Sequence, residues 1–443
     1  MPWQVEHRGG LYLPQVRLWC DVRYPAPRAF VSHAHFDHLG RHVHAICSEG
    51  TARLMRERLG EAGETTVLDY DSPHALEPDT ELRLFPAGHI HGSSLLWLER
   101  AGERLLYTGD FKLRPGRSAE ACATPPADVV IMETTYGRPH YRFPPTEEVL
   151  AGLIRFCRET LEAGEIPVLF GYSLGKSQEI LSSLAEADLP IMLHPQVAKM
   201  TAVYEAMGIT FPPYRKFELK SAKGHAVIAP PQSAQSAWLR KIKPRRTAAI
   251  TGWAMDPGAR FRYQCDALFP LSDHADYGDL LRFVERTGAR CVYTVHGYAR
   301  EFAADLRARG VEAWALGFSN QLELAVGRSS APAPAAPAWQ EAPAEAATAP
   351  PESFLAFAQT AERIRRSTGK LEKVDILRGY LDALPPALTG PAAIFLTGRP
   401  FAQSDARTLQ TGWAILKRAL LAVSGTREAD FRATYRKYSD SGE

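Results

Sequence analysis

Four side chains that commonly bind metal ions lie within six residues of one another, directly after a predicted buried strand. The segment VSHAHFDHLG contains His33, His35, Asp37 and His38, and it follows the apolar run RAFVS. In an extended chain, residues two apart point to the same side, so His33 and His35 can bind one ion while Asp37 and His38 turn toward a second. The spacing therefore predicts a site for two metal ions.

A binuclear site needs a bridging carboxylate and further imidazoles. Candidates stand where later predicted strands end: His89 in PAGHIHGS, Asp110 in LLYTGDF and His296 in YTVHGY. His91, two residues after His89, is an alternative for the same ligand position. A set of imidazole and carboxylate ligands suits zinc, but the ligand types alone do not exclude manganese or iron as the bound metal.

Short apolar runs alternate with amphipathic stretches from residue 1 to about residue 325, which predicts an α/β architecture. The runs that read as buried strands are residues 28–32, 104–110, 128–134, 166–172 and 291–297. Apolar residues at three- and four-residue spacing predict helices over residues 51–62, 147–164 and 278–288.

The composition changes after this region. Residues 328–351 are dominated by Ala and Pro, which favour an extended linker and cannot build a core. The following segment has helical periodicity, and the predicted helices cover residues 353–367, 370–384 and 406–423. We therefore expect a small all-helical segment after the linker.

Charge and cysteine content exclude some classes of protein. The 52 Lys and Arg nearly balance the 50 Asp and Glu, so attraction to nucleic acid must come from local clusters. The six cysteines form no Cys-x-x-Cys, which argues against both a disulfide framework and a zinc finger. No run of about eighteen apolar residues and no leader-like N-terminus is present, so we expect a cytoplasmic protein with no membrane contact.

The ordered ligand set resembles the metallo-β-lactamase fold, a four-layer αββα sandwich, over about residues 1 to 325. Asp21 in WCDVRYP matches the early supporting aspartate of that family, and the family's Gly-His pattern favours His89 over His91. The resemblance implies two zinc ions, with His33, His35 and His89 around the first, Asp37, His38 and His296 around the second, and Asp110 as the bridge. Such a pair of ions activates water for displacement at phosphorus.

Three further features resemble the β-CASP nuclease branch of this fold: Glu133 in METTYG, His274 in LSDHADY and His296 in VHG. In that branch the acidic residue orients a histidine, which contacts the scissile phosphate and can protonate the leaving oxygen. A general acid separate from the metal-bound water makes chemical sense. About 140 residues separate Glu133 from His274, where the branch inserts a cap domain.

Two segments of the predicted cap suit a nucleic-acid strand. GYSLGKSQE resembles the Gly-Lys segment of β-CASP nucleases, where Ser173, Lys176 and Ser177 could contact phosphate near a helix start; a plain strand-to-helix turn is the alternative. Residues 238–264 interleave Arg and Lys with aromatic residues, which suits a single strand. A solvated basic face over core aromatics is the alternative there.

The helical segment, with IFLTGRPF, resembles the start of the DNA-binding domain that precedes the core of ATP-dependent DNA ligases. An unrelated helical bundle is the alternative. No Lys-x-Asp-Gly adenylation motif is present, so we expect no ligation by this chain alone. LSDHADYGDLL and VHGYAREFAADLRARG resemble bacterial ligase-associated DNA exonucleases most closely.

The resemblances together predict a two-zinc DNA nuclease that processes single-stranded or end-processed DNA in repair, beside a DNA ligase domain or subunit. The alternatives are a β-CASP ribonuclease, a small-molecule metallohydrolase and a catalytically silent scaffold. The expected layout is a metallo-β-lactamase domain at 1–145 and 266–327, a cap at 146–265, a linker at 328–351 and a ligase-like helical segment at 352–443.

Overall fold

The computed structural model describes residues 3–316 except 9, 62, 232, 233 and 235, together with residues 350, 352–353, 356–357, 359–360, 363–364, 370–389 and 392. The chain divides into two units, the second beginning at Ala325. In the second unit, helix α10 (Lys370–Asp382) confirms the helix predicted over 370–384. The helix predicted at 406–423, the FLTGRP motif and nearly all of the predicted linker lie outside the described residues.

The first sheet of the first unit has six strands in chain order. Its first three strands pair antiparallel and the others in parallel. The strands are β1 (Glu6–His7), β2 (Leu11–Leu13), β3 (Leu18–Cys20), β4 (Arg28–Phe30), β5 (His44–Cys47) and β6 (Glu64–Val67).

The second sheet has seven strands in the order β19-β18-β11-β10-β9-β8-β7. Strands β7 to β10 form an antiparallel meander, and β10, β11, β18 and β19 are parallel neighbours. The strands are β7 (His74–Glu77), β8 (Thr80–Pro86), β9 (Ser94–Arg100), β10 (Glu103–Tyr107), β11 (Val129–Glu133), β18 (Cys291–Val295) and β19 (Glu312–Ala315).

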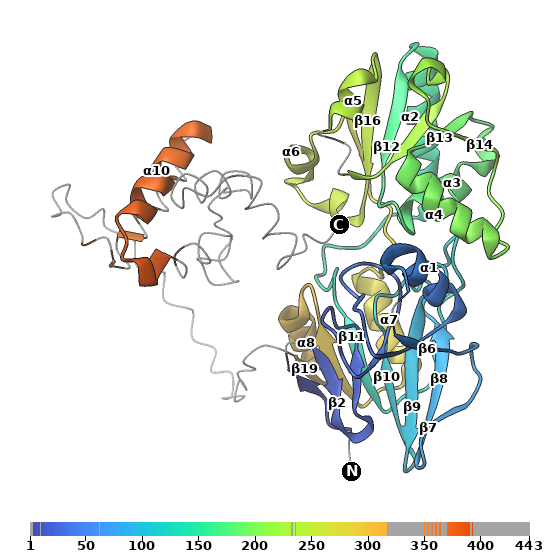
Figure 1. The fold of residues 1–443 in the computed structure, drawn as a ribbon, viewed down its shortest axis with the longest axis vertical. Coiled ribbons are helices and arrows are strands. Elements are labelled where there is room, and N and C mark those ends of the chain that lie inside the picture. The colour runs from blue at the N-terminus through green and yellow to red at the C-terminus, as the bar shows by residue number, and fades with distance from the viewer. Residues whose placement is uncertain are drawn as a thin grey trace. The chain divides into compact units, whose positions relative to one another are not determined.

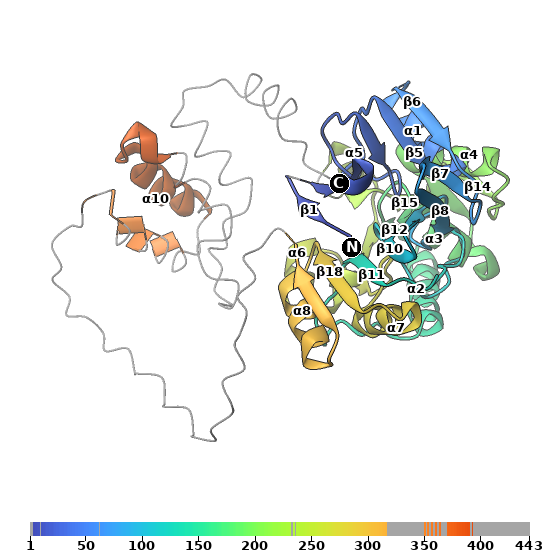
Figure 2. The ribbon, with the colours of Figure 1, turned by 90° about the horizontal axis from the view of Figure 1, so that it is seen from below.

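One apolar cluster joins these two sheets. It includes Leu13 and Phe30 from the first sheet and Leu98 and Ile131 from the second, all fully buried. Apolar residues on the opposite face of each sheet pack against helices, so both sheets are buried on two sides. The helices are α1 (Glu49–Leu59) on the first sheet, and α7 (Tyr277–Thr287) and α8 (Ala299–Ala308) on the second (Figure 1, Figure 2).

Residues 146–269, which we call the cap lobe, build a third sheet that lies above the other two in Figure 1. All of its strands pair in parallel, which requires helical crossovers between them. In order across the sheet the strands are β14 (Tyr214–Lys216), β13 (Ile191–Leu193), β15 (Ala226–Ala229), β12 (Ile166–Phe170), β16 (Arg245–Ile250) and β17 (Ala267–Phe269). The helices are α2 (Thr146–Glu162), α3 (Lys176–Ser183), α4 (Pro195–Ala206), α5 (Ala237–Lys241) and α6 (Ala259–Tyr263). Short 3-10 helices cover Pro14–Val16, Ala185–Ala187, Leu219–Ser221 and Gly252–Met255.

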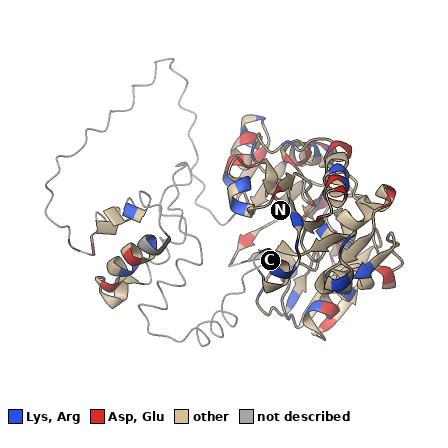
Figure 3. Ribbon diagram, turned by 90° about the horizontal axis from the view of Figure 1, so that it is seen from above, with Lys and Arg blue, Asp and Glu red and all other residues tan. Residues whose placement is uncertain are grey.

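The α/β class predicted from the sequence is confirmed, and so are the five strands and three helices predicted for the first unit. Each of those strands ends before its predicted boundary, because the last residues leave the ladder and enter polar loops. Lys and Arg are mixed with Asp and Glu over this unit (Figure 3). Among the described residues, no helix combines the length and apolarity needed to cross a bilayer.

Candidate metal centre

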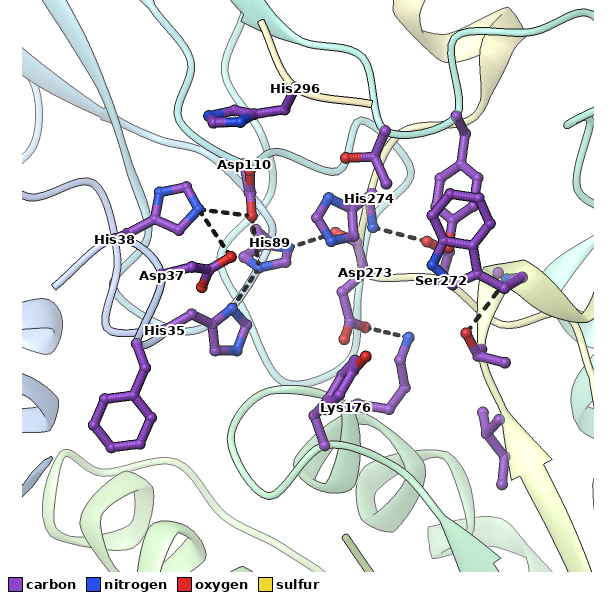
Figure 4. A pocket seen from close by; sticks show the side chains of 18 residues that line it. His35, Asp37, His38, His89, Asp110, Lys176, Ser272, Asp273, His274 and His296 are labelled. Atoms are coloured by element: carbon purple, nitrogen blue, oxygen red, sulfur yellow. Dashed lines mark hydrogen bonds and ion pairs between the residues drawn. The ribbon is translucent and has the colours of Figure 1, made fainter. Parts of the chain in front are cut away.

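Polar residues from both sheets meet at the carboxyl ends of their strands. Asp110 follows β10, Glu133 ends β11 and His296 follows β18, and these three strands are parallel neighbours. The His33–His38 loop follows β4 of the first sheet, and His89 follows β8. Residues far apart in the chain therefore turn toward one pocket (Figure 4).

Four of the predicted ligands form a compact group. Nδ1 of His35 lies 3.0 Å from Nε2 of His33 and 3.1 Å from Nε2 of His89. Oδ2 of Asp110 lies 3.6 Å from Nε2 of His33 and 3.9 Å from Nε2 of His89. All four ligand atoms lie within 4.8 Å of one another, so the group could hold a metal ion.

The outward nitrogens of the imidazoles show which ring atoms carry protons. Nε2 of His35 lies 3.1 Å from the carbonyl oxygen of Leu174, and Nδ1 of His89 lies 2.9 Å from that of Asp273. A carbonyl oxygen only accepts hydrogen bonds, so both outward nitrogens donate, and in the neutral rings the inward nitrogens present lone pairs. Lone pairs 3.1 Å apart repel unless a cation lies between them, so this donor set fits a metal ion.

Asp21 fixes the orientation of two more imidazoles, those of His33 and His38. Its Oδ2 accepts from the hydroxyls of Ser32 at 2.6 Å and Tyr107 at 2.8 Å, and from Nδ1 of His38 at 3.0 Å. The Ser32 hydroxyl, with its proton directed to Asp21, accepts from Nδ1 of His33 at 3.0 Å. Asp21 therefore holds His33 and His38 with their Nε2 atoms facing inward, a support typical of metal sites.

The ligands expected for a second ion are more loosely grouped. Nε2 of His38 lies 3.3 Å from Oδ2 of Asp110 and 3.7 Å from Oδ2 of Asp37. The rings of His38 and His296 lie 6.0 Å apart between centroids. Asp37 and His296 are exposed at the pocket wall, and neither belongs to the compact group found among the described residues.

The protonation states of most residues in this cluster favour the binding of a cation. Burial and the neighbouring imidazoles lower the pKa of His33 and of His89 well below the ordinary value, so both rings are neutral. Burial raises the pKa of Asp110, but His38, His274 and His33 outweigh it and leave the pKa well below normal. Burial lowers the pKa of His38, but Asp110 and Asp21 raise it well above normal, so a bound metal must displace a proton there.

Glu133 and His274 form a hydrogen-bonded pair beside this cluster. Nδ1 of His274 lies 2.8 Å from Oε1 of Glu133, and the His274 ring lies 4.6 Å from the His89 ring between centroids. Oε1 of Glu133 also accepts from the Phe111 amide at 3.0 Å, and the Thr135 hydroxyl donates to Oε2. Only 1% of Glu133 is exposed, so the carboxylate is held rigidly.

The predicted phosphate-contacting residues are buried. Nζ of Lys176 donates to Oδ1 of Asp273 at 2.8 Å, and only 3% of Lys176 is exposed. The Ser177 hydroxyl donates to the Gly171 carbonyl at 3.1 Å, and Ser173 is 7% exposed. Phosphate binding by these side chains stays a prediction, and the structure gives Lys176 a different partner.

Some of the residues around the centre were not predicted. Ser32 stands next to His33 and accepts from its Nδ1, so the need for an acceptor at that nitrogen is a signal for Ser32. The Asp273 carbonyl accepts from Nδ1 of His89, which is distant in the chain, so no local pattern marks it. Tyr136 and Tyr172 line the pocket, but no spacing pattern marks them. Trp253, which also lines it, belongs to the aromatic residues of the segment 238–264. The rejected alternative, His91, lies apart from the compact group, with Nδ1 2.9 Å from Oε1 of Glu120.

No family model matches the chain, but several known proteins are similar to it in sequence. The whole chain is 54% identical to 45% of a probable DNA ligase from Opitutus terrae. Over 39% of its length it is 30% identical to an RNase J-like protein from Methanocaldococcus jannaschii, covering 48% of that protein. Over 32% it is 33% identical to the transcription termination factor FttA of Thermococcus kodakarensis, covering 24%. The chain thus spans less than half the length of each of these relatives.

Proposed function

We propose that this chain is a metal-dependent nuclease with a metallo-β-lactamase fold, in which the cap lobe is a β-CASP insertion. One observation carries the proposal: the inward lone pairs of buried imidazoles converge beside Asp110, and His274, which Glu133 holds at Nδ1, lines the same pocket. A cation site next to a fixed, protonated imidazole suits hydrolysis of a phosphodiester.

The donor set favours zinc, with manganese as the alternative. One ion would be held by His33, His35, His89 and Asp110, and a second by Asp37, His38, His296 and the shared Asp110. When bound, such a pair of ions supplies an activated water and stabilises charge on the oxygens around phosphorus.

His274 would act on the leaving group. Its Nδ1 proton is engaged by Glu133, so Nε2 is the atom that can meet substrate in the pocket. The raised pKa of His274, about 9, keeps the ring protonated near neutral pH, because the carboxylates of Glu133 and Asp110 outweigh the effect of burial. A protonated Nε2 can bind a phosphate oxygen and pass its proton to the leaving oxygen.

The pocket wall suits an unpaired strand. Tyr172 and Trp253 line it together with the cluster, and aromatic rings stack on bases without sequence preference. Lys and Arg of the segment 238–264 stand on the same lobe, where positive charge would neutralise backbone phosphates.

The substrate we propose is DNA, trimmed at its ends during repair alongside a ligase domain or subunit. The 54% identity to a probable DNA ligase over the whole chain supports this choice. RNA is the second candidate, because an RNase J-like protein and a transcription termination factor are also relatives.

The test combines metal analysis with a substrate assay. The purified chain is analysed for metal by mass spectrometry and incubated with end-labelled single-stranded DNA and RNA of one sequence. About two zinc ions per chain with laddered DNA products support the proposal. Preferential cutting of RNA would move the function to RNA processing, and a chain that neither binds metal nor cuts would refute a nuclease.

A further inference from the structure

The first turn of helix α3, in the cap lobe, consists largely of buried polar side chains. Lys176, Gln178 and Glu179 are 3%, 0% and 4% exposed. Burying charged and amide groups is costly unless each finds a partner, so their contacts show what the turn does. Each of the three side chains forms hydrogen bonds or an ion pair with a different segment next to the metal cluster.

Gln178 fastens the loop before the helix. Its Oε1 accepts from the amide of Gly175 at 2.8 Å, and its Nε2 donates to the carbonyl of Ser173 at 3.2 Å. Between these two residues, the carbonyl of Leu174 accepts from Nε2 of His35 at 3.1 Å. The loop therefore holds the His35 ring with Nδ1 facing the cluster.

Gly175 is required for this approach. Its φ of +85° lies in the left-handed region, and a Cβ atom there would lie 2.2 Å from Cγ2 of Ile90, next to His89. Only glycine at position 175 lets the loop before α3 come this close to the loop that contains His89.

Lys176 fastens the segment before α7. Its ammonium group donates to Oδ1 of Asp273 at 2.8 Å and to the carbonyl of Leu271 at 2.9 Å. The carbonyl of Asp273 accepts from Nδ1 of His89, and His274 is the next residue. One buried ion pair thus anchors the segment that orients the His89 ring and carries His274 (Figure 4).

Glu179 fastens the loop after Asp110. Its Oε1 lies 3.2 Å from Nζ of Lys112, and its Oε2 accepts from the amides of Arg117 at 2.8 Å and Ser118 at 3.0 Å. Lys112 stands two residues after Asp110 in the chain.

We propose that the first turn of α3 is a positioning element for the metal centre, and that Lys176 is a positioning residue that acts through Asp273 and not a phosphate contact. The inference rests on the proposed function, because it requires that the cluster binds metal. Metal affinity then depends on a lysine of the cap lobe whose ammonium group bonds Asp273 and Leu271 at the pocket wall.

The test uses the full chain with Lys176→Met alone and with Lys176→Met combined with Asp273→Asn. The single change leaves a buried carboxylate without its partner, whereas the double change removes both charges. We expect the single variant to lose about tenfold or more in zinc affinity, measured by competition with a chelating dye, and the double variant to recover most of it. Affinity of the metal-free chain for single-stranded DNA, measured by fluorescence anisotropy, should not change in either variant.

Lys199→Met is the matched control, because this lysine lies on α4 of the same lobe and its ion pair with Glu57 is exposed. It should leave zinc affinity unchanged. If the single variant does not fold, the test uses the folded double variant alone. The proposal then requires that the zinc affinity of the double variant is close to that of the original chain.

Two results would overturn the proposal: a folded Lys176→Met variant with unchanged zinc affinity, whether or not its DNA binding is weaker, or a folded double variant that regains no affinity. If the unaltered chain binds no zinc and cuts no nucleic acid, the proposed function itself fails. If the unaltered chain binds zinc and cuts, only the role of Lys176 is at stake.

Discussion

Nδ1 of His274 lies 2.8 Å from Oε1 of Glu133, although 141 positions separate the two residues in the chain. The Phe111 amide and the Thr135 hydroxyl hold the same carboxylate, so the imidazole is fixed in one orientation. Such a fixed pair is what a general acid needs, since its proton must be aimed before the bond breaks.

Replacing His274 by Gln should slow cleavage by about a hundredfold or more, because the proton donor is lost while the metal ligands stay. Single-turnover cleavage of labelled DNA measures this step, and zinc content per chain is the control. A rate equal to that of the unaltered chain would remove His274 from the mechanism.

The cleavage rate should fall as the pH rises through the pKa of His274, which the carboxylates raise to about 9 against the opposing effect of burial. Because this pKa is raised on folding, the pair's contribution to stability is fully present below the ordinary value of about 6.5 and is lost as the pH rises through about 9. Glu133→Gln should move the alkaline limb of the rate profile to lower pH. An unmoved limb would assign that limb to another group.

Asp110→Asn should abolish cutting but leave DNA binding largely intact. Oδ2 of Asp110 lies 3.3 Å from Nε2 of His38 and 3.6 Å from Nε2 of His33, so its charge serves the metal site. Zinc content and DNA affinity are measured side by side, with Asp71→Asn as the control because that carboxylate is exposed. Equal loss of binding and cutting would contradict the separation of the two functions.

Asp21→Asn should weaken zinc binding by about 10- to 100-fold. The amide accepts on one oxygen only. Either the Ser32 amide loses the acceptor that Oδ1 supplies, or Nδ1 of His38 and the hydroxyls of Ser32 and Tyr107 lose the one that Oδ2 supplies. Chelator competition gives the affinity, and thermal unfolding of the metal-free chain gives the cost to the fold. A loss of stability with unchanged zinc affinity would make Asp21 a residue of the fold alone.

Local pattern was sufficient for much of the architecture. The apolar run at residues 166–172 and the amphipathic run at 278–288 predicted β12 and α7, because burial on two sides or on one stripe leaves a readable period. The same pattern could not show that the cap-lobe strands form a separate parallel sheet, since strand order depends on long-range pairing.

For the site, the residue types within one short loop determined most of the outcome. His33, His35 and His38 stand together in the sequence, so their chemistry is evident without a structure. The proton-bearing nitrogen of each ring was not evident, because Leu174, Asp273 and Asp21 supply the acceptors from distant segments.

The sequence by itself determined the kinds of ligand, their places at strand ends and the α/β class, since all three follow from residue type and periodicity. Only the tertiary structure decided that Lys176 meets Asp273. The pairing of Glu133 with His274 was implied by the β-CASP resemblance, and no local pattern showed it. A buried charge is stabilised by whichever opposite charge the fold brings within about 3 Å, and that choice depends on the packing of segments far apart in the chain.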